Sequence, residues 1–256
     1  LNSSMFNLCR FLGPAVGALL IDKIGEGYCF LLNAISFIAV IIALYCIKPR
    51  PIELRKQTGS FLRQFTDGLV YVKSVPSIFF LLVLLTVMNL IGTPFNAMMP
   101  AYAKDIFHND SSGYSLMVAA IGLGAAIGGV TLASRGTARG LEKWIVIGTA
   151  LFGVLLTSLG FITHLNIAIG LLGFTGFFMV LPMVASNTLL QSLVDESKRG
   201  RVMSFFGMTF YGMMPIGSLI VGALAETRIG LQGIMALCGI GCVLTAGLFT
   251  FAAPSI

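Results

Sequence analysis

Polar side chains inside otherwise apolar stretches are the places where this sequence could do chemistry. Arg10 opens the stretch RFLGPAVGALLID at 10–22, which closes on an aspartate. An arginine at membrane depth costs about 2.5–3.5 kcal/mol on insertion scales, and a guanidinium binds a carboxylate through a bidentate fork. Arg10 is therefore predicted to bind an anionic substrate group. The alternative is a solvated charge at the helix end, because arginine can extend from there to water.

Neutral polar residues form a second group of candidates. Asn89, Thr93 and Asn96 recur at i, i+4 and i+7, which places them on one face of a helix beside Pro94. Such side chains either line a cavity or form hydrogen bonds between helices. The remaining members of the predicted substrate cavity are Asn187, Gln191 and Tyr211.

Other kinds of chemistry find little support. Cys238 and Cys242 share a helix face at i, i+4 and could bind a soft metal, but two small buried side chains are the expected interpretation, so no metal site is predicted. His108 and His164 are the only histidines, and both fall in turns without a nearby nucleophile or metal-ligand spacing. We therefore expect neither an enzyme nor a bound cofactor. Basic residues interleaved with exposed aromatics, typical of nucleic-acid binding, are not found.

The composition identifies the solvent that must surround these residues. Of the 256 residues, 57% are hydrophobic and 10% are charged, whereas soluble domains average about 25% charged residues. A spanning helix needs roughly 20 mostly apolar residues. The sequence predicts an all-α membrane protein with about eight spans, near 4–21, 28–47, 78–100, 114–133, 144–162, 167–190, 204–225 and 231–251.

Lysine and arginine predict the orientation of these spans, because basic loops stay on the cytoplasmic side. The breaks at 48–77, 134–143 and 191–203 hold most of the basic residues, whereas the other breaks hold only Lys23, Lys104 and Arg228. The first span is therefore expected to run outward, and the C-terminus to be cytoplasmic. Phe61, Leu62, Phe65, Leu69 and Val72 fall near helical spacing, which predicts an amphipathic helix at the interface or against cytoplasmic loops.

Two parts of the chain resemble each other. GALLIDKIGEGYCFLLNA at 17–34 aligns without gaps to GALAETRIGLQGIMALCG at 222–239. In both copies the match covers the end of an outward span, a tight turn and an inward span. Internal repeats of this kind are frequent in transporters. The repeat predicts two parallel six-helix halves, with four helices expected before residue 1.

Small residues and a charge pair are predicted to govern packing and gating. Gly13 and Gly17 lie one turn apart and allow close approach of a neighbouring helix, while Pro14 bends the helix between them. Gly124 and Gly128 form a second close-packing pair. Asp195 and Arg201 are expected either to pair and hold one conformation closed, or to serve as plain membrane-side anchors.

The motifs quoted above resemble the major facilitator superfamily over the whole chain. LNSSMFNLCRFLGPAVGALL and GEGYCFLLNAISFIAV are similar to the fifth and sixth helices of its exporter group, which includes the enterobactin exporter. DESKRGRVMSFFGMTFYGMMPIGSLIVGALAE is similar to that group's region between the tenth and eleventh spans. The resemblance implies helices 5–12 of a twelve-helix fold, divided into the end of the N-terminal half (1–47), a linker with an amphipathic helix (48–77) and the C-terminal half (78–256).

The resemblance also implies a function. It predicts an exporter of an amphiphilic small molecule such as a drug or siderophore, working by alternating access as a monomer in a bacterial inner membrane. The partners are then the substrate, the lipid bilayer and a coupling proton. No acidic residue falls in the middle of a span, so the coupling carboxylate is expected in the four helices before residue 1. The alternative is a truncated carrier that binds or regulates without transporting.

Overall fold

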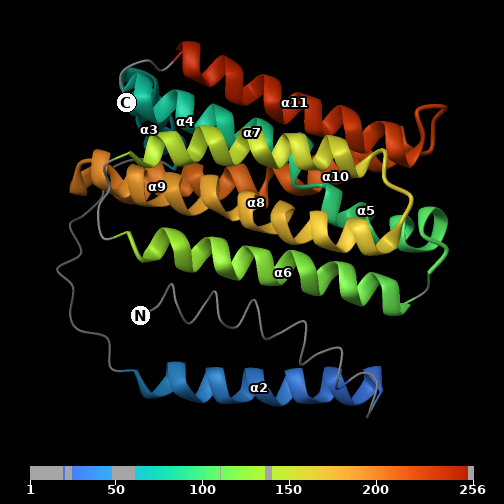
Figure 1. The fold of residues 1–256 in the computed structure, drawn as a ribbon. Helices are drawn as coiled ribbons and strands as arrows, with labels where there is room; N and C mark the ends of the chain where they lie inside the picture. Colours follow the sequence, from blue (N-terminus) through green and yellow to red (C-terminus); the bar gives the residue numbers. More distant parts are fainter. Residues whose placement is uncertain (1–19, 21–24, 48–60, 110, 136–139, 253–256) are drawn as a thin grey trace.

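The fold was analysed in a computed structural model that describes residues 20, 25–47, 61–109, 111–135 and 140–252. The described residues form helices and the turns between them, which confirms the all-α membrane class (Figure 1). Seven helices are long and apolar enough to cross a membrane: Gly27–Cys46, Pro76–Ile106, Ser112–Ala133, Leu141–Leu159, Leu165–Leu193, Lys198–Ala225 and Gly230–Thr250. They correspond to seven of the eight predicted spans. The first, at 4–21, falls almost entirely outside the described residues.

Helix α2 (Glu26–Cys46) lies apart from the other described helices (Figure 1). It is apolar on all sides, and none of its 18-residue hydrophobic window is buried against the other helices that the structure describes. A helix that is hydrophobic all round belongs in lipid or in a protein core. The surroundings of α2 must therefore come from lipid or from protein outside the described helices.

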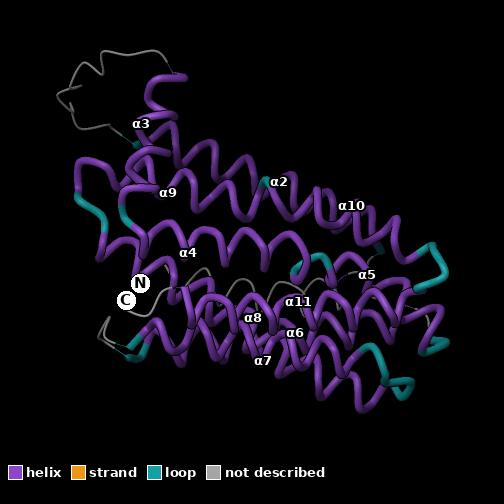
Figure 2. Tube along the Cα trace, turned by 90° about the horizontal axis from the view of Figure 1, so that it is seen from above, coloured by secondary structure: helices purple, strands orange, loops and turns teal. Residues whose placement is uncertain are grey.

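The other six spans form one bundle. The first of them is α4 (Pro76–Val87), η1 (Met88–Gly92), α5 (Phe95–Ala101) and η2 (Tyr102–Ile106) in succession, and the rest are α6 (Ser111–Ala133), α7 (Leu141–Leu159), α8 (Leu165–Leu193), α9 (Glu196–Tyr211) with α10 (Met213–Ala225), and α11 (Gly230–Ala252). Figure 2 shows α9 and α10 along one side and α6, α7, α8 and α11 along the other, with α4 between them.

Glycines bring helices α6 and α8 into backbone contact. A Cβ on Gly124 would lie 1.7 Å from the carbonyl oxygen of Gly173, and one on Gly176 would lie 2.1 Å from that of Ile121. Gly128 likewise faces the carbonyl oxygen of Phe177 at 2.7 Å. Since membrane helices associate through packing and not through the hydrophobic effect, such contacts are a main source of helix–helix affinity. Helices α6 and α8 therefore form a tight pair.

A second glycine pair joins α7 to α11. A Cβ on Gly153 would lie 2.6 Å from the Gly239 carbonyl oxygen, and one on Gly239 would lie 2.4 Å from the Thr157 nitrogen. Helices α7 and α8 also meet closely, because a Cβ on Gly148 would lie 2.9 Å from the Cδ of Pro182. Helices α6, α7, α8 and α11 are thus linked side by side.

Helix α3 (Phe61–Ser74) is the amphipathic part of the predicted linker. Its Val72 is buried, and the ring of Phe65 lies against that of Phe205 in α9, with 5.1 Å between the centroids. Gly68 allows this approach, since a Cβ there would lie 2.8 Å from the Phe205 ring. The Lys198 ammonium sits 4.1 Å from the centre of the Tyr71 ring. Helix α3 therefore packs on the first turns of α9.

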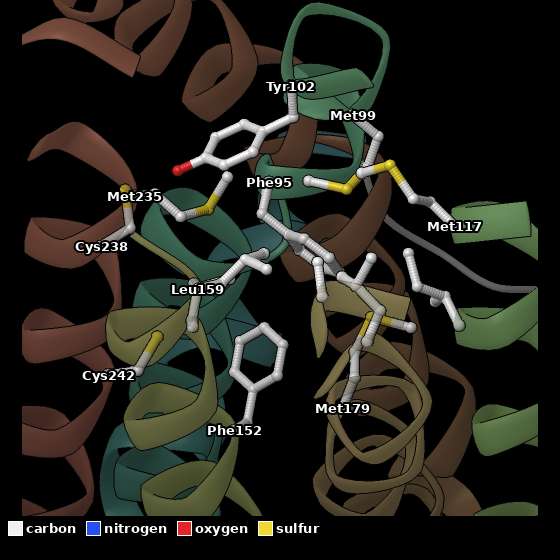
Figure 3. Close-up of a cluster of buried hydrophobic side chains, with 14 of the residues drawn as sticks. Phe95, Met99, Tyr102, Met117, Phe152, Leu159, Met179, Met235, Cys238 and Cys242 are labelled. Atoms are coloured by element: carbon white, nitrogen blue, oxygen red, sulfur yellow. The ribbon is translucent and has the colours of Figure 1, made fainter. Parts of the chain in front are cut away.

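The interior of the bundle divides into two hydrophobic clusters stacked along the helices. The basic-end core lies near Arg135 and the first turns of α7 and α9, which carry Lys143 and Lys198. From α4 it includes Ile78, Leu81, Leu82, Leu84 and Leu85. The far-end core lies toward the opposite ends and contains Met88, Phe95, Met99, Tyr102, Met117, Phe152, Leu156, Leu159, Met179, Met235, Cys238 and Cys242, among others. Figure 3 shows part of this second core.

Three of the spans carry an irregular feature near the level where the two cores meet. The first contains η1, between Leu85 of the basic-end core and Phe95 of the far-end core. Helix α8 is continuous, but its interior proline Pro182, which has no amide hydrogen to donate, follows directly on the change from one core to the other. Helices α9 and α10 are divided by a turn at Gly212. The bundle therefore has a shared level of helix irregularities near its middle.

Candidate functional site

The candidate site is built around η1, where the backbone switches to π-helical hydrogen bonding. The Thr93 amide donates to the carbonyl oxygen of Met88, five residues earlier, over 3.1 Å. Pro94 follows at once and has no amide hydrogen to donate. As a result the Asn89 carbonyl receives no hydrogen bond from the amide of Thr93 or from position 94. π-helical segments inside α-helices occur frequently at functional sites.

The predicted polar residues of this span supply the missing donors. The Thr93 hydroxyl donates to the Asn89 carbonyl oxygen over 3.0 Å and lies 3.3 Å from the Asn89 side-chain oxygen. The Asn89 amide group, which is only 2% exposed, donates to the carbonyl oxygen of Leu85 over 2.8 Å. In lipid every backbone polar group must be satisfied within the protein. Thr93 therefore supplies a donor to the carbonyl that the break leaves without an amide, and Asn89 bonds to the preceding turn of its own helix.

Asn96 connects the break to helix α8. Its amide group donates to the carbonyl oxygen of Thr93 over 3.4 Å and contacts the Met179 sulfur at 3.9 Å. Met179 belongs to the far-end core, next to the turn in which α8 reaches Pro182. Asn96 thus links the turn at Pro94 to α8, one turn before Pro182.

Helix α10 covers η1 from the other side. A Cβ on Gly217 would lie 2.0 Å from the carbonyl oxygen of Leu90 and 2.8 Å from the Cγ of Pro94. In an α-helix this carbonyl would bind the amide at position 94, which proline lacks. Glycine alone permits the approach, and its Cα–H can make a weak contact to the oxygen. Gly217 therefore shields a carbonyl that the break exposes.

The other predicted cavity residues lie away from this cluster. The Gln191 amide group donates to the side-chain oxygen of Asn187, one turn earlier in α8. At 1.5 Å per residue, Asn187 lies about 12 Å along the helix from Met179, toward the basic end. Tyr211 ends α9 with 87% of its surface exposed. Within the described part of the chain, no hydrogen bond joins these residues to the Asn89 cluster.

The predicted gating residues have different surroundings. Asp195 precedes the first turn of α9, where its charge suits the positive end of the helix, and its carbonyl accepts the Lys198 amide over 2.9 Å. Arg201 is half-buried, with its Cβ beside Gly68 of α3. Among the described residues no ion pair joins Asp195 to Arg201. Gly124 and Gly128 lie in the α6–α8 contact described above, and Arg10, Gly13, Pro14 and Gly17 lie outside the described residues.

The sequence alone does not identify two glycines of the site. Gly217 and Gly92 matter through residues far away in the sequence: a Cβ on Gly217 would meet the Leu90 carbonyl oxygen, and one on Gly92 would lie 2.7 Å from the Cys242 sulfur. The useful signal was the sequence NLIGTPFN, in which an asparagine, a threonine and a proline fall within six residues of an apolar span. Such a combination indicates a helix irregularity with its own hydrogen-bond donors.

The charge distribution limits which molecules the described helices can bind. Within the described spans, acidic and basic side chains lie only in the terminal turns, as with Glu142, Lys198 and Asp105. The side chains that the middle of the bundle offers are amides, hydroxyls, thioethers and aromatic rings. The arrangement is suited to binding a neutral or amphiphilic molecule and to bending, and it has no set of groups in catalytic arrangement.

Comparisons with known proteins agree with this description. Residues 1–254 match the family described as transmembrane secretion effector, a branch of the major facilitator superfamily. The chain is 23% identical over 222 residues to an uncharacterised major facilitator-type transporter, YfmI, of Bacillus subtilis, which covers 85% of this chain and 55% of that protein.

Two further relatives are named as efflux proteins. The multidrug efflux pump Tap of Mycolicibacterium fortuitum is 24% identical over 87% of this chain and 55% of its own length. The macrolide efflux protein A of Streptococcus pyogenes is 24% identical over 93% of this chain and 60% of its own length. The chain thus spans little more than half the length of these relatives. With the family match over nearly all of its residues, it belongs to the transmembrane secretion effector family of the major facilitator superfamily.

Proposed function

We propose that this chain forms part of an exporter of small amphiphilic molecules that works by alternating access. The observation that carries the mechanism is the shared level of helix irregularities: the π-helical η1, the interior Pro182 of α8 and the turn at Gly212. The direction of transport is inferred from relatives named as efflux proteins. Transport, and not catalysis, is then the activity of the site.

The two cores give alternating access a physical basis. Close-packed interiors move as units, since they are bistable and not continuously deformable. Bending at the shared level lets the basic-end parts of α4, α8 and α9 tilt while the far-end core keeps its packing. The glycine contacts of α6 with α8 and of α7 with α11 lie beside the far-end core and hold that part of the bundle together.

The proposed substrate contacts follow from exposure and chemistry. Thr93 and Asn96 are half-buried and lie at the break, and Tyr211 and Gln191 are exposed on α9 and α8. Neutral hydrogen-bonding groups beside aromatic and thioether side chains suit an amphiphile such as a macrolide. Arg10 would add a partner for an anionic group.

Coupling, orientation and assembly complete the proposal. Lys198, Arg199 and Arg201 at the start of α9 support a cytoplasmic location of the basic end, because basic residues stay on the cytoplasmic side, and the membrane is proposed to be a bacterial inner membrane. Because carboxylates are missing from the middle of the described spans, a proton would be carried by an acid elsewhere in the protein. The protein is proposed to act as a monomer.

The full-length protein should lower accumulation of a macrolide or a fluorescent lipophilic drug in energised cells, and a proton uncoupler should abolish this effect. Thr93→Val removes the hydroxyl that donates to Asn89 and should reduce efflux several-fold. The matched control is Thr131→Val in α6, where an exposed hydroxyl donates to the Ile127 carbonyl in the same way over 2.7 Å. Accumulation equal to that of cells without the protein would refute export, and equal efflux by both variants would refute the role of the break.

A further inference from the structure

Helices α3 and α9 meet along a seam at the basic end of the bundle (Figure 2). The phenylalanine pair described above lies at one end of this seam, with 5.1 Å between the ring centroids. The Lys198 ammonium lies at the other end, 4.1 Å from the centre of the Tyr71 ring. Between them, a Cβ on Gly68 would lie 3.6 Å from the Cβ of Arg201. These three contacts place Lys198 and Arg201 on the side of α9 that faces α3.

The two cations of the α3–α9 seam have no acidic partner. Arg201 is half-buried, and among the described residues neither its guanidinium nor the Lys198 ammonium forms an ion pair. The acids on or next to these two helices are Asp67, Asp195 and Glu196, and all three are exposed. At three residues apart on one helix, the Cβ atoms of the two cations are about 5–6 Å apart, and like charges at this spacing repel. The seam therefore favours an anion that contacts both.

An apolar surface lies beside these cations. Phe65 and Leu69, one turn apart on α3, remain 37% and 36% exposed. Amphipathic helices of this kind lie at the level of the lipid headgroups. Trp144, a residue type that is enriched at this level, packs against the same basic-end core as Tyr71 and Phe205. The seam thus lies at the depth where the phosphate groups of a lipid meet its acyl chains.

We propose that the α3–α9 seam binds one anionic glycerophospholipid, such as phosphatidylglycerol. Arg201 presents a planar fork that can bind two phosphate oxygens at once, and Lys198 adds a point charge to the same group. The acyl chains lie over Phe65 and Leu69. Basic pockets between helices on the cytoplasmic side are typical sites for anionic headgroups. The bound lipid ties the linker helix α3 to α9, and the site does not depend on which molecule the protein exports.

Binding of fluorescent phosphatidylglycerol to the purified full-length protein in neutral detergent micelles tests the site. One phosphatidylglycerol should bind per chain, whereas phosphatidylcholine, which has a phosphate but no net charge, should bind about 10-fold more weakly. Inorganic phosphate at the same concentration should not displace the lipid, because it has no acyl chains to contact Phe65 and Leu69. Displacement by inorganic phosphate would indicate a site for free anions and would overturn the proposal, as would equal binding of the two lipids.

Variants of α9 separate the seam from the general positive charge of this end. Arg201→Gln should weaken binding of phosphatidylglycerol by about 10-fold and Lys198→Gln by about 5-fold, while Arg201→Lys keeps the charge and should lose less. The matched control is Arg199→Gln, which removes the same charge from an exposed position of the same turn. Its effect should stay below about 2-fold at physiological ionic strength, because exposed charges are screened. Equal losses in Arg199→Gln and Arg201→Gln, or unchanged binding in both Arg201→Gln and Lys198→Gln, would refute a specific lipid site.

Discussion

Replacing Gly124 with alanine should separate helices α6 and α8. The new Cβ would lie 1.7 Å from the Gly173 carbonyl oxygen, whereas ordinary van der Waals contact begins near 3.4 Å. The two backbones must therefore move apart by roughly 1.7 Å, the difference between these distances. Since the atom that is met belongs to the backbone, no side-chain rotation can relieve the clash.

The expected loss of stability is large for one methyl group. Overpacking of a close-packed interior costs typically about 1–3 kcal/mol. We expect the cost of Gly124→Ala to lie at the upper end of this range, because the α6 and α8 backbones are already in contact and neither can rotate away. A loss of about 3 kcal/mol corresponds to about 150-fold in the unfolding equilibrium. Thermal unfolding of the full-length protein in detergent micelles, followed by circular dichroism, measures this difference.

Two glycines of α8 provide the controls. A Cβ on Gly173 would come no closer than 3.8 Å to the Ala120 carbonyl oxygen, and one on Gly170 would meet no atom within 4 Å. Both alanine variants should be as stable as the parent or more stable by about 0.5–1 kcal/mol, because glycine destabilises a helix interior. Equal effects of Gly124→Ala and Gly173→Ala would show that Gly124 does not face the Gly173 carbonyl oxygen as described.

Three further variants test the break and the orphan hydroxyl. Gly217→Ala places a Cβ 2.0 Å from the Leu90 carbonyl oxygen and should lower both the folding equilibrium constant and the efflux rate by at least 10-fold. Gly222→Ala in the same helix should change neither quantity. Asn89→Leu removes a buried donor and should cost about 1–2 kcal/mol in the same unfolding assay; an unchanged midpoint would contradict its backbone role. The buried Tyr102 hydroxyl has no hydrogen-bond partner among the described residues, so Tyr102→Phe should stabilise the protein by about 1 kcal/mol, and a loss of stability would mean that the hydroxyl has a partner.

The sequence could predict the spans because their signal is strong and local. Twenty apolar residues in a row decide the position of a helix without reference to its neighbours, and α7 and α11 begin and end within three residues of the predicted limits. The amphipathic segment near residue 65 was also predicted from its periodicity, and the structure adds that it packs on α9.

The roles of the polar residues could not be predicted in the same way. The i, i+4, i+7 spacing predicted a shared face for Asn89, Thr93 and Asn96, and in the structure the Thr93 hydroxyl bonds to Asn89 and the Asn96 amide group bonds to the Thr93 carbonyl. It said nothing of the π-helical segment, which depends on a proline, on the neighbours of η1 and on where each carbonyl points. Gly217 illustrates the same limit, since its importance comes from Leu90, which lies 127 residues earlier in the chain.

The hydrogen bonds at η1 restrict how the bundle can open. The Leu90 carbonyl cannot bind an amide at position 94, and Gly217 of α10 lies directly against it. If α10 moved away into lipid, this carbonyl would be uncovered where an unsatisfied polar group costs several kcal/mol. If water entered as α10 moved, the same carbonyl would be solvated and most of that cost would vanish. Helix α10 can therefore separate from η1 only toward a space that fills with water, so in this fold opening at the break and hydration of a cavity are one event.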